Sequence, residues 1–143
     1  MTRDSPPAEG RGGTGVADRQ RISTGGPWEA SAGYSRALVA GDSCFVAGTT
    51  DAGPDGISQH PGDAGGQAHA VFAIIEGALA EGGFTLDDVV RTRMFVTDRA
   101  DIAAVSGAHG AVFGGIRPAA TLVIVAGLMH ASLLVEIEAE ARR

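Results

Sequence analysis

The segment RPAATLVIVAGLMHASLLVEIEAEARR, residues 117–143, holds the clearest structural pattern in this chain. It contains two β-like runs, residues 120–126 and 133–141, joined by a connection that includes glycine. In the second run apolar and polar side chains alternate, which is typical of a β-strand with one face on a hydrophobic layer. The other face carries Leu134, Glu136, Glu138 and Glu140. We therefore expect two strands, the second with a buried face and a polar face.

Glu136 is the best candidate acid or base in this segment. Three carboxylates in a row on one strand face repel one another, so we interpret Glu138 and Glu140 as solvated. Glu136 lies in the middle of the strand, between Leu134 and Glu138, where water is scarcer. A place on a solvated sheet face remains the alternative, because alternation alone does not separate the two.

Composition narrows the class of protein. A chain of 143 residues is expected to form one domain. The formal net charge of −6 disfavours nucleic-acid and anionic-membrane partners. No apolar run approaches the roughly 20 residues of a membrane span, and the N-terminus lacks the hydrophobic region of a signal peptide. We expect a soluble, cytoplasmic protein.

The sequence also predicts that no cofactor or metal is bound. There is no lysine for a Schiff base or for a phosphate loop, and Cys44, the only cysteine, is interpreted as a small core residue. No histidine pair has the spacing of metal ligands. A G-x-G-x-x-G pattern at Gly10, Gly12 and Gly15 has no strand before it, so we assign it no dinucleotide.

The remaining segments predict one α+β domain, residues 21–143, behind a disordered tail, residues 1–20. The tail has almost no apolar residues with which to offset its ordering entropy. Two helices, ending at Gly-Gly pairs, and six strands give the order β-β-β-α-β-α-β-β. Before the final two strands, the strands are expected at residues 20–24, 34–40, 43–49 and 89–97, and the helices at 63–81 and 101–113.

With both helices on one face of the sheet, the two-layer arrangement leaves the other face bare. We predict that this bare face carries Phe95, Leu122, Ile124 and Leu134 among polar groups. An exposed apolar face of that size indicates a partner, and a closed homo-oligomer is the simplest one.

His109 lies on the apolar stripe of the second predicted helix. A histidine in such a place is either a core residue with a satisfied hydrogen bond or a residue at the edge of a cleft, where it could titrate near neutral pH. The sequence leaves both interpretations open.

Several fragments resemble the Rid family (RidA/YjgF type), over roughly residues 22–142. Residues 33–35, Gly-Tyr-Ser, and 45–48, Phe-Val-Ala-Gly, resemble its G-P-Y-S and v-x-x-S-G-Q segments. Residues 88–92 with 95–98 resemble its D-V-V-K-T…F-V-x-D run, and Pro118-Ala119 its P-A-R-S motif. Residues 135–139, Val-Glu-Ile-Glu-Ala, resemble V-E-I-E-A. The resemblance implies a chorismate-mutase-like fold and a homotrimer with small-molecule clefts between subunits.

The family activity implied is hydrolysis of reactive enamines and imines to a 2-oxo acid and ammonia, with an arginine binding the substrate carboxylate. Ala120 stands where that arginine belongs, Thr49 where the family has glutamine and Ser106 where it has asparagine. Classical 2-imino acid deamination is therefore not expected. We predict Arg93 or Arg117 as the substitute, and an ion pair from Arg93 to Glu136 or Glu138 as its structural alternative.

Two functional hypotheses follow. In the first, the protein is an enzyme acting on a small electrophile: Glu136 activates water, Tyr34 orients the substrate and backbone N–H groups near Gly48 donate to it. The remaining predicted binding residues are Thr49, Arg93, Ser106, His109 and Leu122. In the second, the protein is a non-catalytic small-molecule binding or interaction protein, or an accessory enzyme of a biosynthetic pathway.

Overall fold

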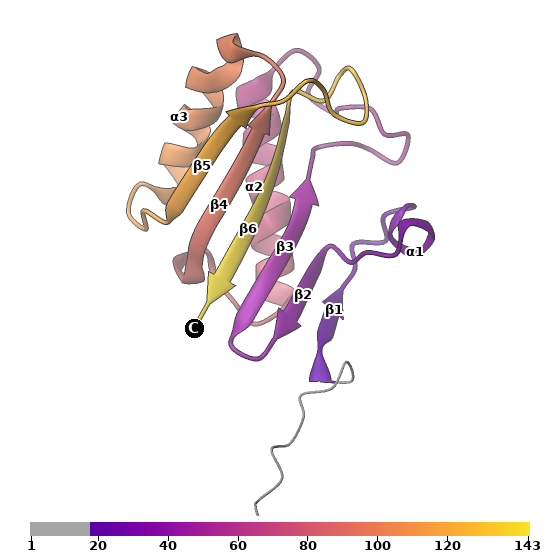
Figure 1. Cartoon of the computed structure of the whole chain (residues 1–143), viewed down its shortest axis with the longest axis vertical. Helices are drawn as coiled ribbons and strands as arrows, with labels where there is room; N and C mark the ends of the chain where they lie inside the picture. The colour runs from indigo at the N-terminus through magenta and orange to yellow at the C-terminus, as the bar shows by residue number, and fades with distance from the viewer. Residues whose placement is uncertain (1–17) are drawn as a thin grey trace, which may run out of the picture.

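The computed structural model describes residues 18–143, which form one six-stranded sheet with three helices (Figure 1). The strand order is β1-β2-β3-β6-β4-β5, and every neighbouring pair is antiparallel except β4 and β5. The elements are β1 (Gln20–Ile22), α1 (Glu29–Ala32), β2 (Ala37–Ala40), β3 (Ser43–Thr49), α2 (Ala64–Glu81), β4 (Val89–Val96), α3 (Ile102–Phe113), β5 (Ala119–Ile124) and β6 (Val135–Arg142), with 3₁₀ turns at Leu86–Asp88 and Arg99–Asp101.

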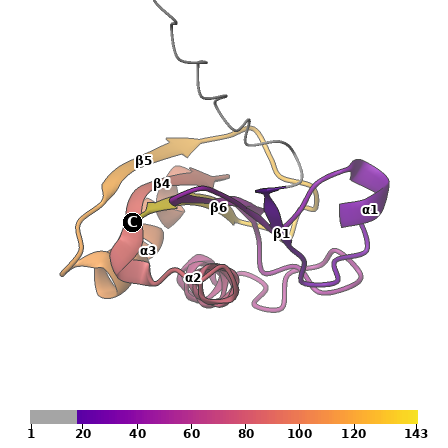
Figure 2. The same ribbon diagram turned by 90° about the horizontal axis from the view of Figure 1, so that it is seen from below.

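The α+β fold predicted from the sequence is confirmed, and α2 and α3 lie on one side of the sheet (Figure 2). Asp63 begins α2, because its side chain accepts a hydrogen bond from the Gly66 backbone N–H at 2.9 Å. The inward residues of β6, β4 and β3 meet α2 and α3 in one core, which includes Cys44. Residues 1–17, which include most of the predicted tail and the glycine pattern at residues 10–15, lie outside the described residues.

The prediction that β5 turns Leu122 and Ile124 to the bare face of the sheet is wrong. Parallel pairing places Leu122 beside Met94, whose side chain is buried under the helices, and Leu122 packs against that core. Ile124 likewise pairs with Val96, so Val123 is the residue that shares the open face with Phe95. The reason is that residues 119–124 are almost continuously apolar, so their sequence carries no alternation from which to choose a face.

A register irregularity in β4 turns the Val90 side chain towards solvent. The pairing of β4 with β6 shifts between Val89 and Arg91, and the Val90 side chain is 47 % exposed instead of sharing the buried face of Thr92. An extra residue of this kind is a β-bulge, which re-aims the side chains on one side of it.

The open face of the sheet combines exposed apolar residues with a row of charges. Phe45 is 45 % exposed and Val123 is 42 % exposed. Arg93 Nη1 donates to Glu138 Oε1 at 2.9 Å and to Glu140 Oε1 at 3.1 Å. Repulsion along the glutamate row is therefore relieved by arginine from the neighbouring strand, and the face keeps an apolar area without cover from residues 18–143.

Candidate functional site

The sheet brings Glu136 against Gly48. Glu136 lies near the start of β6, and Gly48 lies near the end of β3, where the pairing of the two strands is irregular between Val46 and Thr49. A Cβ on Gly48 would come within 2.9 Å of Glu136 Oε1, so the absence of a side chain is what admits the carboxyl group. Two residues that the sequence singled out are therefore in contact.

The environment of Glu136 favours its neutral form. Burial raises the pKa of the Glu136 carboxyl, the Arg36 guanidinium opposes that rise, and Glu138 adds to it. The net shift is upward. A carboxyl group with a raised pKa can hold a proton nearer to neutral pH, which suits a group that alternately takes and gives one.

Arg36 lines the cavity beside Glu136, and the sequence analysis did not single it out. Its Nη1 donates to the Gly48 carbonyl oxygen at 2.7 Å and to Thr49 Oγ1 at 2.8 Å. Its guanidinium carbon lies 5.6 Å from the centre of the Tyr34 ring. The signal was present, because Arg36 directly follows the Gly-Tyr-Ser fragment and is a charged residue at the start of an apolar strand.

The Glu29 carboxylate fixes the position of the Arg36 backbone by a hydrogen bond. The Glu29 side chain, in α1, is 8 % exposed and accepts hydrogen bonds from the Arg36 backbone N–H at 3.0 Å, the Gly26 backbone N–H at 2.8 Å and Ser23 Oγ at 3.0 Å. Burial by itself would raise the pKa of Glu29, but these donors and the charge of Arg36 leave it lowered. Glu29 is thus a buried carboxylate that fixes α1 and the start of β2 together.

Arg36, Gly48 and Glu136 line a cavity of about 680 Å³ at one end of the sheet. In Figure 1 the loop after β3, the connection before β6 and α1 all lie at this side of the molecule. Tyr34, Arg36, Thr49 and Glu136 form a polar part of the cavity. Its apolar part is formed by Trp28, Pro54, Ile74, Met129 and Leu133. The cavity therefore offers both a charged end and an apolar wall, as small-molecule sites do.

A second hollow, of about 710 Å³, lies over the open face of the sheet. Its charged lining includes Arg93, Glu138 and Glu140, which already satisfy one another. The cavity with Glu136 is the better candidate site, because it brings Tyr34, Gly48, Thr49 and Glu136 together.

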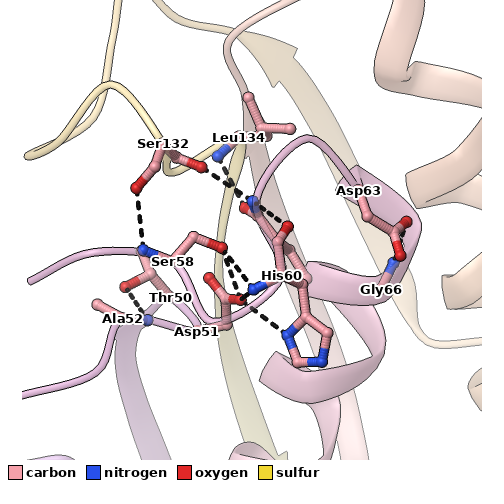
Figure 3. Close-up of polar contacts among 10 residues, drawn as sticks. Thr50, Asp51, Ala52, Ser58, His60, Asp63, Gly66, Ser132 and Leu134 are labelled. Atoms are coloured by element: carbon pink, nitrogen blue, oxygen red, sulfur yellow. Dashed lines mark hydrogen bonds and ion pairs between the residues drawn. The ribbon is translucent and has the colours of Figure 1, made fainter.

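One wall of the cavity, the loop after β3, is held by the buried carboxylate of Asp51 (Figure 3). Asp51 Oδ2 accepts from Ser58 Oγ at 2.8 Å and from the His60 backbone N–H at 3.0 Å, and it lies 3.0 Å from His60 Nδ1. Ser58 and His60 thereby fold back onto the end of β3, and residues 52–56 line the cavity.

Gln67, on α2, ties this loop to the opposite wall. Its side chain is fully buried, and its Nε2 donates to the His60 carbonyl oxygen at 3.1 Å and to the Ser132 carbonyl oxygen at 2.9 Å. Its Oε1 accepts from the Leu134 backbone N–H at 2.8 Å. The loop from β3 and the connection before β6 are therefore joined through one amide.

Arg93 and His109 lie elsewhere in the chain. Arg93 is paired on the open face with Glu138, one of the two partners predicted for its structural role, and with Glu140. His109 lies on the helix side of the sheet, where its Nε2 is 2.8 Å from Thr92 Oγ1 and its ring packs against Phe72 and Phe113. Burial lowers the pKa of His109.

The other predicted binding residues divide in the same way. Tyr34 and Thr49 line the cavity with Glu136, whereas Ser106 is exposed on α3 and Leu122 packs on the helix side. Within one chain the structure therefore unites Tyr34, Gly48, Thr49 and Glu136, adds Arg36, and separates them from residues 106, 109 and 122.

Across residues 18–143, no group of three or more His, Cys, Asp or Glu side chains is placed to hold a metal ion. In the same part of the chain, no helix has both the length and the hydrophobicity required to cross a bilayer.

Replacing Gly48 with alanine should damage the site without unfolding the protein. The new Cβ would displace the end of the flexible Glu136 side chain, not backbone, so we expect stability to change by less than about 1 kcal/mol and turnover to fall at least ~10-fold. Thermal unfolding and imine hydrolysis measure the two effects. Gly77→Ala is the control, since a Cβ there meets open space, and unchanged turnover in Gly48→Ala would contradict the assignment.

Residues 26–143 match the family model described as Endoribonuclease L-PSP. An uncharacterized protein of Streptomyces coelicolor is 39% identical over 124 residues, which cover 87% of this chain and 92% of that protein. A RutC family protein of Pyrococcus horikoshii is 32% identical over 108 residues, which cover 76% of this chain and 85% of the relative.

Solved structures of the same family are similar to this chain. A member of the YjgF/YER057c/UK114 family from Mycobacterium tuberculosis is 42% identical, with a TM-score of 0.79 over 87% of this chain and 99% of the other. A Rid family protein of unknown function from Yersinia pestis is 29% identical, with a TM-score of 0.76 over 87% and 99%. The chain therefore belongs to the Endoribonuclease L-PSP family, that is, the YjgF/Rid family that its sequence motifs resemble.

Proposed function

We propose that this protein hydrolyses a small imine or enamine in the cavity beside Glu136. The observation that carries the proposal is the Glu136 carboxyl group, which faces the cavity against Gly48 and near Arg36, in an environment that raises its pKa. The resemblance of the sequence motifs to the Rid family, which implies hydrolysis of enamines and imines, supports the same class of chemistry.

In the proposed reaction Glu136 accepts a proton from water while the water oxygen bonds to the carbon of the C=N group, and the nitrogen receives that proton, which gives a carbinolamine. The hydroxyl proton of the carbinolamine then passes through Glu136 to the nitrogen as the C–N bond breaks and the C=O bond forms, so the products are a carbonyl compound and ammonia. No oxidant or reductant is required. Glu136 is suited to return its proton to the leaving nitrogen, because the same group can act as base and then as acid.

Tyr34 and the backbone at Gly48 have supporting roles in this proposal. Tyr34 is 37% exposed and lines the cavity, so its ring and hydroxyl can orient a ligand. We propose that backbone N–H groups near Gly48 donate hydrogen bonds to the substrate. Thr49, whose hydroxyl accepts from Arg36, shapes the same end of the cavity.

The test is the release of ammonia from imines that an amino-acid oxidase makes in situ, together with neutral imines prepared separately. The folded protein should raise the rate for the neutral imines above that of buffer in proportion to protein concentration, and the 2-imino acids made by the oxidase test whether the chain hydrolyses them with Ala120 in place of the family arginine. Binding of such ligands without any increase in rate would favour the alternative, a non-catalytic small-molecule binding protein.

A nuclease function, which the family description names, is less well supported by this chain. The formal net charge is −6, and the strand that bears Glu136 also carries Glu138 and Glu140. Binding to an RNA backbone depends on positive charge that displaces counterions, so a cavity and face of this composition disfavour it.

The open face of the sheet supports a homotrimer, the assembly that the family resemblance implies. Phe45 and Val123 are exposed on that face with nothing in residues 18–143 over them. We expect light scattering at micromolar concentration to give about three chains per particle, because a closed ring would bury this face. A clean monomer would contradict the expected assembly.

A further inference from the structure

We propose that His130 is a pH-sensitive switch in the connection before β6, residues 125–134. The neutral imidazole ring holds this connection against the loop after β3, and protonation of the ring releases it. Met129, His130 and Leu133, which all belong to the connection, line the cavity that contains Glu136. Release therefore opens the cavity whatever ligand it binds, so the inference does not rest on the proposed function.

One ring nitrogen of His130 is a hydrogen-bond acceptor in this structure. The Ser132 backbone N–H donates to His130 Nδ1 at 3.1 Å, and a backbone N–H can only donate. Nδ1 therefore carries no proton, and the ring is neutral with its proton on Nε2. Ser132 Oγ lies 2.8 Å from the same nitrogen, so the hydroxyl group donates to it as well.

The Ser132 hydroxyl group connects the His130 ring to the loop after β3. Ser132 Oγ accepts a hydrogen bond from the Ser58 backbone N–H at 2.9 Å, a contact drawn in Figure 3, and Ser58 is buried. Because the hydroxyl hydrogen is directed to His130, the oxygen lone pairs are free to accept from Ser58. The two hydrogen bonds therefore support each other, and together they join the two loops.

Protonation of His130 turns the acceptor Nδ1 into a donor. The Ser132 hydroxyl group can reverse its role, because its oxygen also accepts, but the Ser132 backbone N–H cannot. Two N–H groups then face each other at the 3.1 Å that now separates their nitrogens. The turn at residues 130–132 must open to part them, which moves Ser132 Oγ away from Ser58. The closed arrangement is thus favoured at neutral pH and lost as pH falls through the ordinary histidine range, near about 6.5.

The two other histidines with polar contacts in residues 18–143 have partners that tolerate both protonation states. His60 Nδ1 lies 3.0 Å from Asp51 Oδ2, and an N–H at that position suits a carboxylate whether the ring is neutral or charged. His109 Nε2 faces the Thr92 hydroxyl group, which can donate or accept. The obligate donor against a ring nitrogen is what distinguishes His130.

The charged groups around His130 come from other elements, because residues 125–134 contain no other charged side chain. Those that line the cavity with His130 are Arg36 at the start of β2, Asp55 in the loop after β3 and Glu136 in β6. None of the three is in an ion pair with His130 within residues 18–143. All three are retained in the variants used below, so a pH response that disappears with the His130 ring belongs to that ring.

The experiment is residue-resolved hydrogen exchange of the full-length protein between about pH 7.5 and pH 5, with each rate corrected for the intrinsic exchange rate at that pH. We expect the protection of the Ser58 amide to fall ~5-fold across this range, the effect of one lost hydrogen bond. The amide of Ile137, in the central strand β6, should keep its protection.

Three variants assign the response. His130→Asn places an amide oxygen where Nδ1 lies, and asparagine accepts there from the backbone N–H two residues on but cannot be protonated. Its Ser58 amide should match the wild type at neutral pH and stay protected in acid. His130→Ala has no acceptor, so protection should be ~5-fold lower at every pH. His60→Asn keeps a donor for Asp51 and should respond to pH as the wild type does.

Two results would overturn the inference: a Ser58 protection that does not change with pH in the wild type, and a pH response that persists in His130→Asn. Loss of the response in His60→Asn would do the same, because it would place the switch at His60. None of these results concerns the release of ammonia from imines, so the inference and the proposed function fail separately.

Discussion

Replacing Glu136 with glutamine is expected to abolish imine hydrolysis and, in the same variant, to raise the thermal stability of the protein. Glutamine keeps the shape of the side chain but cannot take a proton, so turnover should fall by ~10²- to 10⁴-fold. The gain in stability arises because burial disfavours the charged carboxylate of Glu136. Removing that cost should add about 1 kcal/mol, or roughly 2–5 °C in the unfolding midpoint.

The pH dependence gives this prediction a sign. The folded-state pKa of Glu136 is raised, so between the unfolded and folded values the folded state binds more protons than the unfolded state. The contribution of Glu136 to stability is therefore lost as pH rises through that window. Glu136→Gln should exceed the wild type in stability above the window and match it below.

The change in stability is measured by unfolding midpoints between about pH 4 and pH 8, which span the ordinary carboxyl range and the working pH. The loss of turnover is measured by single-turnover rates. Glu140→Gln is the matched control, because it removes from the same strand a carboxylate that is paired with Arg93. The control should keep its turnover and gain no stability. If Glu136→Gln is less stable than the wild type and still active, Glu136 is not the acid or base of the reaction.

Replacing His109 with alanine is expected to destabilise the protein by about 2–4 kcal/mol, the range for large-to-small changes in a core. The His109 ring packs against Phe72 and Phe113, with ring centres 5.8 and 4.8 Å away. Its removal also leaves the Thr92 hydroxyl, in a fully buried residue, without its partner at 2.8 Å. Denaturant unfolding measures the loss.

His109→Phe is the control, since it fills the space and removes only the hydrogen bond, so its loss should be smaller. Burial lowers the pKa of His109 below its ordinary value of 6.5. The stability that the neutral ring contributes is therefore present above that value and is lost as pH falls, and His109→Phe should lack this dependence. If His109→Ala instead keeps its stability and loses turnover, His109 belongs to the site.

The sequence predicted those parts of the fold in which a local pattern carries the information. The alternation of residues 133–141 predicted β6, which spans Val135–Arg142, and Asp63 marked the start of α2. The face of β5 was missed because its residues are apolar on both sides. The helix α1 was missed because four residues are too few to show a helical period.

The site was predicted only in part for a related reason. Glu136 and Gly48 could be found from the motifs around them, but their contact depends on a local irregularity in the β3–β6 pairing. Arg36 reaches Gly48 because the β2–β3 hairpin pairs Ala37 with Val46, which places Arg36 opposite the last residues of β3. Such a contact is a property of strand register, and no local pattern in the sequence expresses it.

The amide of Gln67 makes the two walls of the cavity a single moving part. Both of its polar atoms are committed to backbone groups, and they belong to two different loops. The Ser58 backbone N–H also donates to Ser132 Oγ at 2.9 Å, so the two loops are bonded to each other as well as to α2. We expect them to open together, with the backbone amides of Ser58 and Leu134 exchanging their hydrogens at one common rate. The time that a ligand stays in the cavity would then be set by that rate, and not by the strength of its contacts alone.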